Sequence, residues 1–159
     1  MAALLAGHSF RFLFRTDQGR IDSRTWWRGT LLLGAILLPL TLIWFAISGY
    51  AQRDLKPDAV LVNWPTLVTY VYLLLYAFAV ILIAICHYNL SAKRFRDRGL
   101  PSSLAGLLPF LALFAGAMHW LYPRVSEAMP YWLVFVSDVL LIATVVFNLI
   151  ELNKGSRGA

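Results

Sequence analysis

The sequence predicts an all-α integral membrane protein, a bundle of four transmembrane helices with an interfacial amphipathic segment at its N-terminus. Two observations carry this prediction. The 159-residue chain is 60% hydrophobic with a mean hydropathy of +0.68, which is far above the range of soluble domains. Its charged residues also lie almost entirely outside four long apolar runs. Since about 20 apolar residues of helix cross a hydrocarbon core roughly 30 Å thick, each run predicts one span.

The four spans and their short links use most of the chain, so we expect a single transmembrane domain over residues 1–159. Links of about a dozen residues or fewer should make consecutive helices antiparallel neighbours. The first three runs contain no Asp, Glu, Lys or Arg, and the fourth contains only Asp138. The expected spans are about 29–51, 65–87, 104–122 and 131–150.

Residues 1–18 form the predicted amphipathic segment. Aromatic and aliphatic residues alternate there with Arg11 and Arg15, as expected of a piece that lies on lipid headgroups. A glycine ends the segment, and Asp22 or Ser23 is placed to cap the helix that continues into the first span.

Two prolines fall inside predicted spans, Pro39 in the first and Pro109 in the third. Each removes a backbone hydrogen bond and is expected to kink its helix, which neighbouring helices can tolerate. Ser102 or Ser103 is the expected cap of the third helix.

The basic residues predict the orientation. Of the 14 Lys and Arg residues, 11 lie on one side of the membrane: five before the first span, four between the second and third, and two in the tail. The positive-inside rule therefore places both termini in the cytoplasm. Trp26 and Trp27 should then lie at the inner interface. At the outer interface we expect Tyr50, Trp64, Trp120, Tyr122, Tyr131 and Trp132, because amphipathic rings prefer that depth.

Two cytoplasmic segments are the most specific local signals: GRIDSRTWW at residues 19–27 and AKRFRDRGLPS at residues 92–102. Together they resemble the bacterial inner-membrane family called domain of unknown function 805. That family has a Gly-Arg, Arg, aromatic-Trp pattern before its first span and a basic pair, Asp, Gly and Ser before its third. Here Asp97 stands for the acid and Gly99 for the turn. The resemblance implies a multi-pass bacterial inner-membrane protein and supplies no activity.

The same segments predict a basic face. On a helix, the three arginines of the first segment would fall on one stripe at i, i+4 and i+8. The second segment adds four cations at the same membrane face. They are candidate contacts for anionic phospholipids or an acidic partner, although ordinary topology determinants would have the same pattern. The seven residues are Arg20, Arg24, Arg28, Lys93, Arg94, Arg96 and Arg98.

Two acids among these cations predict a structural clip. Asp97 is expected to pair with Arg20, with Arg24 or with an arginine of its own loop, and Asp22 to pair with Arg96 or Arg98. Exposed pairs of this kind contribute under about 1 kcal/mol each.

Asp138 lies seven residues inside the fourth span, so it is roughly 10 Å deep at 1.5 Å per residue. A carboxylate there costs about 2.5–3.5 kcal/mol on insertion scales, so it must face protein. Three explanations stay open. A neutral Asp138 could hydrogen-bond Tyr70 or Tyr72, an ionised one could pair with His119 or a cation of another subunit, or the residue could belong to a proton or ion path.

No catalytic, cofactor or metal pattern is present, so we expect neither an enzyme nor a cofactor, and no nucleic-acid partner. The first function class that remains is an accessory or scaffold protein that docks against other integral membrane subunits. The small-residue face Ala112-x-x-x-Gly116 favours it. The alternatives are a small oligomeric transporter or channel with Asp138 on the path, and an envelope protein that binds anionic lipids through the basic face.

Overall fold

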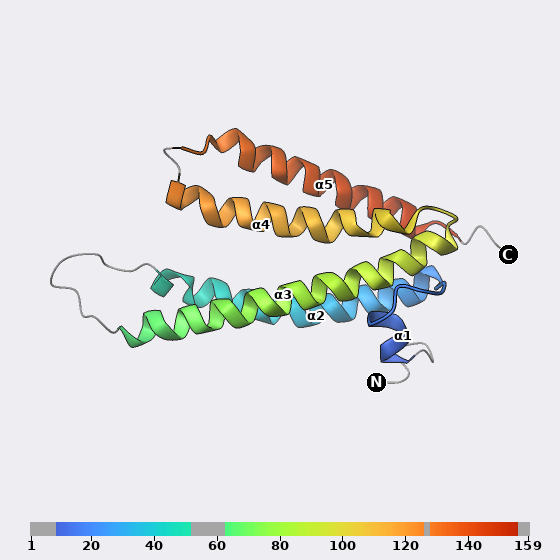
Figure 1. The fold of residues 1–159 in the computed structure, drawn as a ribbon, viewed down its shortest axis with the longest axis horizontal. Coiled ribbons are helices and arrows are strands. Elements are labelled where there is room, and N and C mark those ends of the chain that lie inside the picture. The colour runs from blue at the N-terminus through green and yellow to red at the C-terminus, as the bar shows by residue number, and fades with distance from the viewer. Residues whose placement is uncertain (1–8, 52–62, 126–127, 156–159) are drawn as a thin grey trace. The chain divides into compact units, whose positions relative to one another are not determined.

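The computed structural model of the chain describes residues 9–51, 63–125 and 128–155, and every regular element in this part is helical (Figure 1). The predicted all-α class with four long apolar helices is confirmed. The elements in chain order are α1 (Phe10–Phe14), α2 (Ser23–Ile47), the 3₁₀ turn η2 (Ser48–Ala51), α3 (Trp64–Asp97), the 3₁₀ turn η3 (Ser102–Gly106), α4 (Leu107–Val125) and α5 (Tyr131–Asn153).

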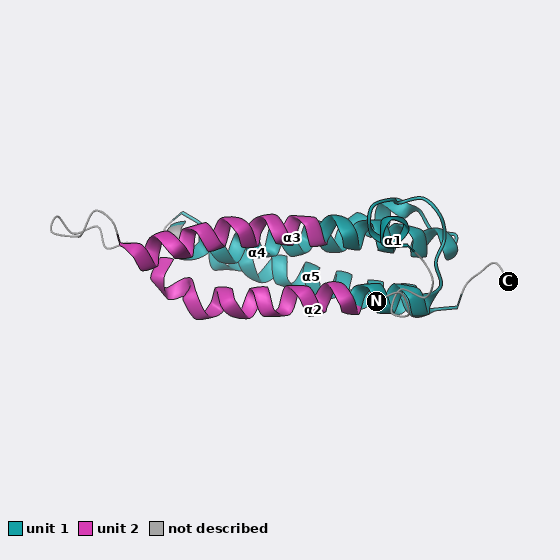
Figure 2. Ribbon diagram, turned by 90° about the horizontal axis from the view of Figure 1, so that it is seen from below, with its two compact units in different colours: residues 1–30, 84–159 teal, residues 31–83 magenta. Residues whose placement is uncertain are grey.

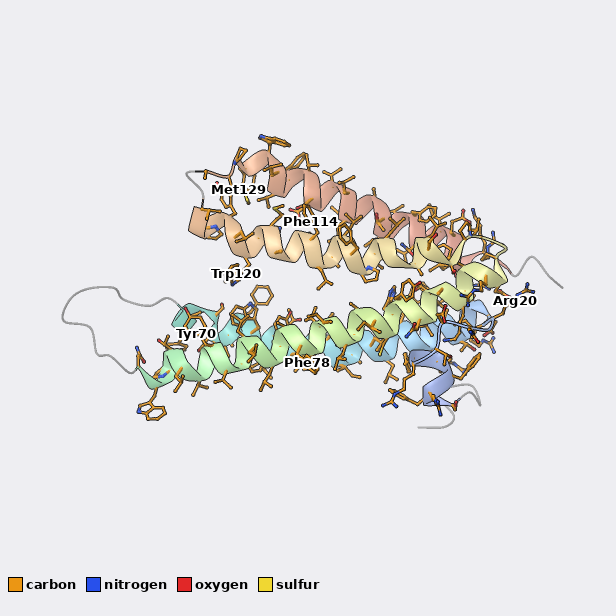
Figure 3. The ribbon with its side chains drawn as sticks, in the orientation of Figure 1. Arg20, Tyr70, Phe78, Phe114, Trp120 and Met129 are labelled. Carbon is orange, nitrogen blue, oxygen red and sulfur yellow. The ribbon has the colours of Figure 1, made fainter. Side chains whose placement is uncertain are left out.

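The long helices present their apolar side chains outward. In the most apolar stretch of each helix, only 6%, 6%, 11% and 22% of the residues are buried within the protein, in chain order. Phe78, at 62% exposure, projects away from the α3 ribbon (Figure 3). Exposing this much apolar surface to water is unfavourable in free energy, whereas exposing it to the hydrocarbon of a bilayer is not. The chain is therefore a multi-pass membrane protein.

The described chain divides into two compact units (Figure 2). Unit 2, Leu31–Ile83, holds the middle of α2 against the first part of α3. The Tyr72 hydroxyl donates to the Leu40 carbonyl at 2.6 Å, and the hydroxyls of Thr41 and Tyr76 lie 3.0 Å apart. Because residue numbers rise on one helix as they fall on the other, the two segments are antiparallel, as the short link predicts.

Unit 1 comprises residues 1–30 and 84–159, so it contains α1, the start of α2, the end of α3 and the hairpin of α4 and α5. The hairpin is antiparallel, and near its tip the rings of Tyr122 and Tyr131 meet edge to face at 5.3 Å. At its other end, Phe147 stacks on Phe95 of α3 at 6.3 Å. The most completely buried part of this unit is the end of α3.

The start of α2 is set by Asp22, whose carboxylate accepts from the Thr25 N–H at 3.1 Å. This confirms Asp22 as the cap. Gly19 precedes it with a φ of +101°, and a side chain there would collide with the Phe12 ring at 2.8 Å. Arg20 therefore lies outside the helix, and the predicted three-arginine stripe is wrong: only Arg24 and Arg28 share a face of α2.

The basic segment predicted as a loop is mostly helix. At 34 residues α3 is about 51 Å long, so it extends well beyond a hydrocarbon core of roughly 30 Å. It ends at Gly99, whose φ is +70°. The Gly99 N–H donates to the Arg96 carbonyl and the Leu100 N–H to the Phe95 carbonyl, at 3.0 and 2.9 Å. This is a Schellman ending, and it confirms Gly99 as the turn residue.

Two smaller expectations for the third span are corrected. Pro109 lies in the first turn of α4, where a backbone N–H has no partner within its helix, so the proline does not break a helical ladder there. Neither Ser102 nor Ser103 caps the helix, because both lie inside η3 and Pro101 precedes them without a side-chain cap. Pro39 lies inside α2, as expected.

Gly29 and Gly34 of α2 give a matched test of the contact between α2 and the end of α3. A Cβ at Gly29 would lie 2.7 Å from Leu90, a fully buried residue, whereas one at Gly34 would meet nothing within 4 Å. Both changes to valine have the same effect on helix propensity. We expect Gly29→Val to lower stability by about 1–3 kcal/mol relative to Gly34→Val, the usual cost of overpacking.

The measurement is unfolding of both variants in the same detergent. Equal stability of the two variants would contradict a close approach of α2 and α3 at Gly29.

Candidate functional site

The last turns of α3 are buried on every side. All seven residues from Asn89 to Phe95 are buried, and Lys93 and Arg94 are 0% exposed. A buried cation is costly unless its donors are hydrogen-bonded. The partners of these two side chains therefore define what this region does.

Lys93 binds backbone carbonyls at the end of α1. Its Nζ donates to the Leu13 carbonyl at 2.9 Å, to the Thr16 carbonyl and to the Asn89 carbonyl at 3.3 Å. The same ammonium lies 5.1 Å from the centre of the Phe12 ring. Carbonyls at a helix C-terminus lack partners within the helix and carry partial negative charge, so a lysine there is favourable.

Two more side chains of α3 hold the same segment. Asn89 donates to the Phe14 carbonyl at 2.8 Å. Arg96 donates to the backbone carbonyl of Asp17 and, at 2.9 Å, to its carboxylate. This bond from Arg96 lowers the pKa of the Asp17 carboxyl. We call residues 9–17, which α3 fixes in this way, the N-terminal arm.

Arg94 and Arg98 bind the backbone carbonyls at the end of α5 in the same way. Arg94 donates from Nε to the Leu152 carbonyl at 3.0 Å and from Nη2 to the Lys154 carbonyl. Arg98 donates to the Gly155 carbonyl, and its guanidinium lies 3.7 Å from the carboxylate of Glu151. The cations of α3 thus bind the carbonyl ends of two other helices.

The start of α2 joins the same assembly through its tryptophans. Trp26, 2% exposed, donates to the Ser91 hydroxyl at 3.1 Å, and Trp27 donates to Asn153 at 3.3 Å. We call residues 89–98, which are the end of α3 and the residue after it, together with the segments that they bind, the basic junction.

Of the seven cations predicted as one lipid face, four are bound within the protein and three are exposed. Lys93, Arg94 and Arg98 are buried, so they do not contact headgroups as predicted. They turn inward because helix-end carbonyls offer them fixed hydrogen-bond partners. Arg96 is partly exposed but is paired with Asp17. The other three, Arg20, Arg24 and Arg28, are exposed, and none makes an ion pair with a described residue.

Asp97 pairs with Arg94 of its own segment, one of the partners expected for it. Both residues lie on α3, so this pair does not clip the N-terminal segment to the second basic segment. Asp22 is used as the cap of α2 rather than as a partner of the loop arginines, so that expectation is wrong. Those arginines have nearer acids in Asp17 and Glu151. The charge pattern alone singles out neither acid, although Asp17 lies at the end of the amphipathic segment and Glu151 directly follows the fourth apolar run. Trp26 is likewise buried rather than facing lipid.

Asp138 meets His119. The His119 Nε2 lies 3.0 and 3.1 Å from the two carboxylate oxygens, and the side chains are 58% and 37% exposed for His119 and Asp138. His119 is thus one of the partners expected for Asp138, and the contact fits both a His119–Asp138 pair and a proton path through the two groups. The tyrosine explanation is wrong, because Tyr70 and Tyr72 donate to the carbonyls of Ala51 and Leu40, respectively.

Within residues 9–51, 63–125 and 128–155, no three His, Cys, Asp or Glu side chains lie close enough to hold a metal ion. Comparisons of the chain with models of protein families, with curated proteins and with solved structures find no match. The similarity of the two basic segments to domain of unknown function 805 therefore stays a hypothesis.

Replacing Lys93 should release the N-terminal arm. Lys93→Met keeps the length of the side chain but leaves the Leu13 and Thr16 carbonyls without their donor, which costs about 1–3 kcal/mol. We expect trypsin to cleave faster after Arg11 or Arg15 in this variant. Arg28→Met, which removes an exposed cation, is the control. An unchanged cleavage rate in Lys93→Met would mean that the arm is held by other contacts.

The cap at Asp22 gives a pH-dependent prediction. Its bond to the Thr25 N–H lowers the pKa of the Asp22 carboxyl below its usual value of 3.8. The charged cap therefore contributes its full free energy to stability above that value. This contribution is lost as the pH falls through the lower pKa of the folded state. Asp22→Ala should lose about 0.5–2 kcal/mol at neutral pH, and Asp22→Asn less.

Unfolding in detergent at pH 7 and at acid pH measures this effect. The stability of the wild type should approach that of Asp22→Asn in acid, and a constant difference between them would contradict the assignment.

Proposed function

We propose that this chain is a non-catalytic accessory or scaffold protein of the bacterial inner membrane that docks against other integral membrane subunits. The observation that carries the proposal is the His119–Asp138 pair. It lies on an apolar hairpin that is otherwise suited to lipid, yet both side chains are partly exposed. Such a pair calls for a covering partner.

The depth of the pair supports this argument. Asp138 is seven residues from the start of α5, and His119 is six residues from the end of α4. At 1.5 Å per residue both are about 10 Å from the ends of their helices. Ionisable groups at such depths are costly against hydrocarbon and normally face protein or water.

The surface beside the pair suits the approach of another helix. Ala112, Gly116 and His119 follow one another at i, i+4 and i+7 on α4, and Ala112 and Gly116 are exposed. A side chain added at Gly116 would meet nothing within 4 Å. Small residues allow close packing of helices in membranes, so this face can take a partner helix next to the polar pair.

The basic junction favours a structural role. Its buried cations bind the protein's own backbone carbonyls, which leaves them unsuited to a substrate. The excess of basic residues on the side of both termini supports a cytoplasmic location for that end.

A proton or ion path through Asp138 is the second candidate. The direct contact of His119 and Asp138 favours it, because the imidazole and the carboxylate can exchange a proton. Asp138→Asn separates the two functions. In a docking protein the amide still hydrogen-bonds His119, so the complex should survive. In a transporter the same change should abolish proton flux in proteoliposomes and leave the fold unchanged.

Docking itself is tested by filling the exposed face of α4. Gly116→Leu should leave the unfolding temperature of the isolated chain near that of the wild type, since the position is open. It should abolish co-purification of the partner in mild detergent. The mass of the intact assembly, measured after purification, shows whether the partner is retained. Gly34→Leu, also at an open position, is the control and should retain the partner. A wild-type chain that purifies alone at the monomer mass would contradict the proposal.

A further inference from the structure

Five arginines near the N-terminus have no internal role. All five are exposed, and none forms an ion pair with any residue that the structure describes. This sets them apart from Lys93, Arg94, Arg96 and Arg98, which are bound within the junction. We call the exposed set the arginine face: Arg11, Arg15, Arg20, Arg24 and Arg28.

The junction gives this face a fixed geometry. On one side of α1, Leu13 and Phe14 are 1% exposed and packed in the protein. Arg11 is exposed in the same helix, and so is Phe10, at 51%. Because Lys93 holds the backbone of the arm from within, the segment that carries Arg11 and Arg15 does not need to fold when it binds. This preorganisation lowers the entropic cost of an interaction.

The position of the face indicates its ligand. Arg24 and Arg28 lie one turn apart on α2, directly before the apolar run that begins at Gly29. Cations at this point of a spanning helix lie at the depth of the headgroup phosphates. Arginine is suited to that group, because its planar guanidinium donates two parallel hydrogen bonds to phosphate oxygens. The exposed Phe10 adds an apolar group at the same end of unit 1, as interfacial segments require.

We propose that the arginine face binds the headgroups of anionic phospholipids in the adjoining leaflet and so ties the N-terminal arm to the membrane surface. This inference is independent of the proposed docking function, which depends on α4 and α5. It also differs from the prediction from sequence, because the cations of α3 take no part in it. Figure 3 shows Arg20, a member of the face, at the end of the molecule where α2 and the end of α3 meet.

The experiment measures lipid binding to the detergent-purified full chain by native mass spectrometry. Dioleoyl phosphatidylglycerol is the anionic probe, dioleoyl phosphatidylcholine the neutral one. Each cation near an anionic surface contributes about fivefold in affinity. The pair Arg24→Gln and Arg28→Gln should therefore weaken phosphatidylglycerol binding by roughly 25-fold and leave phosphatidylcholine binding unchanged.

The matched control removes the charge of a cation that is already bound. Lys154 lies in the same unit and is paired with Glu151. Lys154→Gln should change phosphatidylglycerol binding by less than about twofold, whereas Arg28→Gln alone should weaken it about fivefold. Arg24→Lys with Arg28→Lys keeps the charge and should retain most of the affinity. If the glutamine variant fails to fold, the lysine pair still tests whether positive charge at these two positions is needed for binding.

Three results would overturn the proposal. Equal losses in Lys154→Gln and Arg28→Gln would mean that only the net charge matters. Competition by millimolar inorganic phosphate would indicate a site for free phosphate instead of a lipid. Unchanged lipid binding in the test pair, together with loss of a co-purifying acidic protein, would assign the face to that protein.

Discussion

The structure of the basic junction depends on the burial of cations against helix-end carbonyls. Lys93 and Arg94 are fully buried, and their donors meet the carbonyls of Leu13, Thr16, Leu152 and Lys154. A helix end exposes carbonyls that no residue of the helix can satisfy. The end of α3 supplies donors to two such ends at once. Removing either partner would leave a buried polar group unpaired, which costs more than the bond itself contributes.

This arrangement explains how one chemical type of residue has two roles. Arg94 and Arg28 carry the same group, yet one binds protein and the other is exposed. The difference lies in the backbone around them. Arg94 is on a helix that continues past the membrane and between the ends of α1 and α5, whereas Arg28 is on the first turns of α2, on its exposed side. Lipid headgroups and partner proteins can reach only the second kind.

The hairpin of α4 and α5 obeys a different constraint. Within hydrocarbon a polar group must find its partner in the protein. Asp138 and His119 satisfy each other at 3.0 Å, but they remain partly exposed. Nearby, Gly116 leaves open space on the helix surface. An exposed polar pair beside small residues is the combination that helix association in membranes uses. The basic junction joins α1, α2, α3 and α5 through hydrogen bonds, whereas the proposed docking face lies on the hairpin.

The sequence by itself determined the four apolar helices, a cap of α2 at Asp22 or Ser23, and the turn at Gly99. These features depend on composition and on local backbone chemistry, which neighbouring residues settle. Tertiary structure alone decided that Lys93 and Trp26 are buried, that Asp17 holds Arg96, and that His119 rather than a tyrosine meets Asp138. Those partners are mostly backbone carbonyls or side chains distant in sequence. A charge pattern specifies neither, because any nearby carbonyl can accept a cation's hydrogen bond.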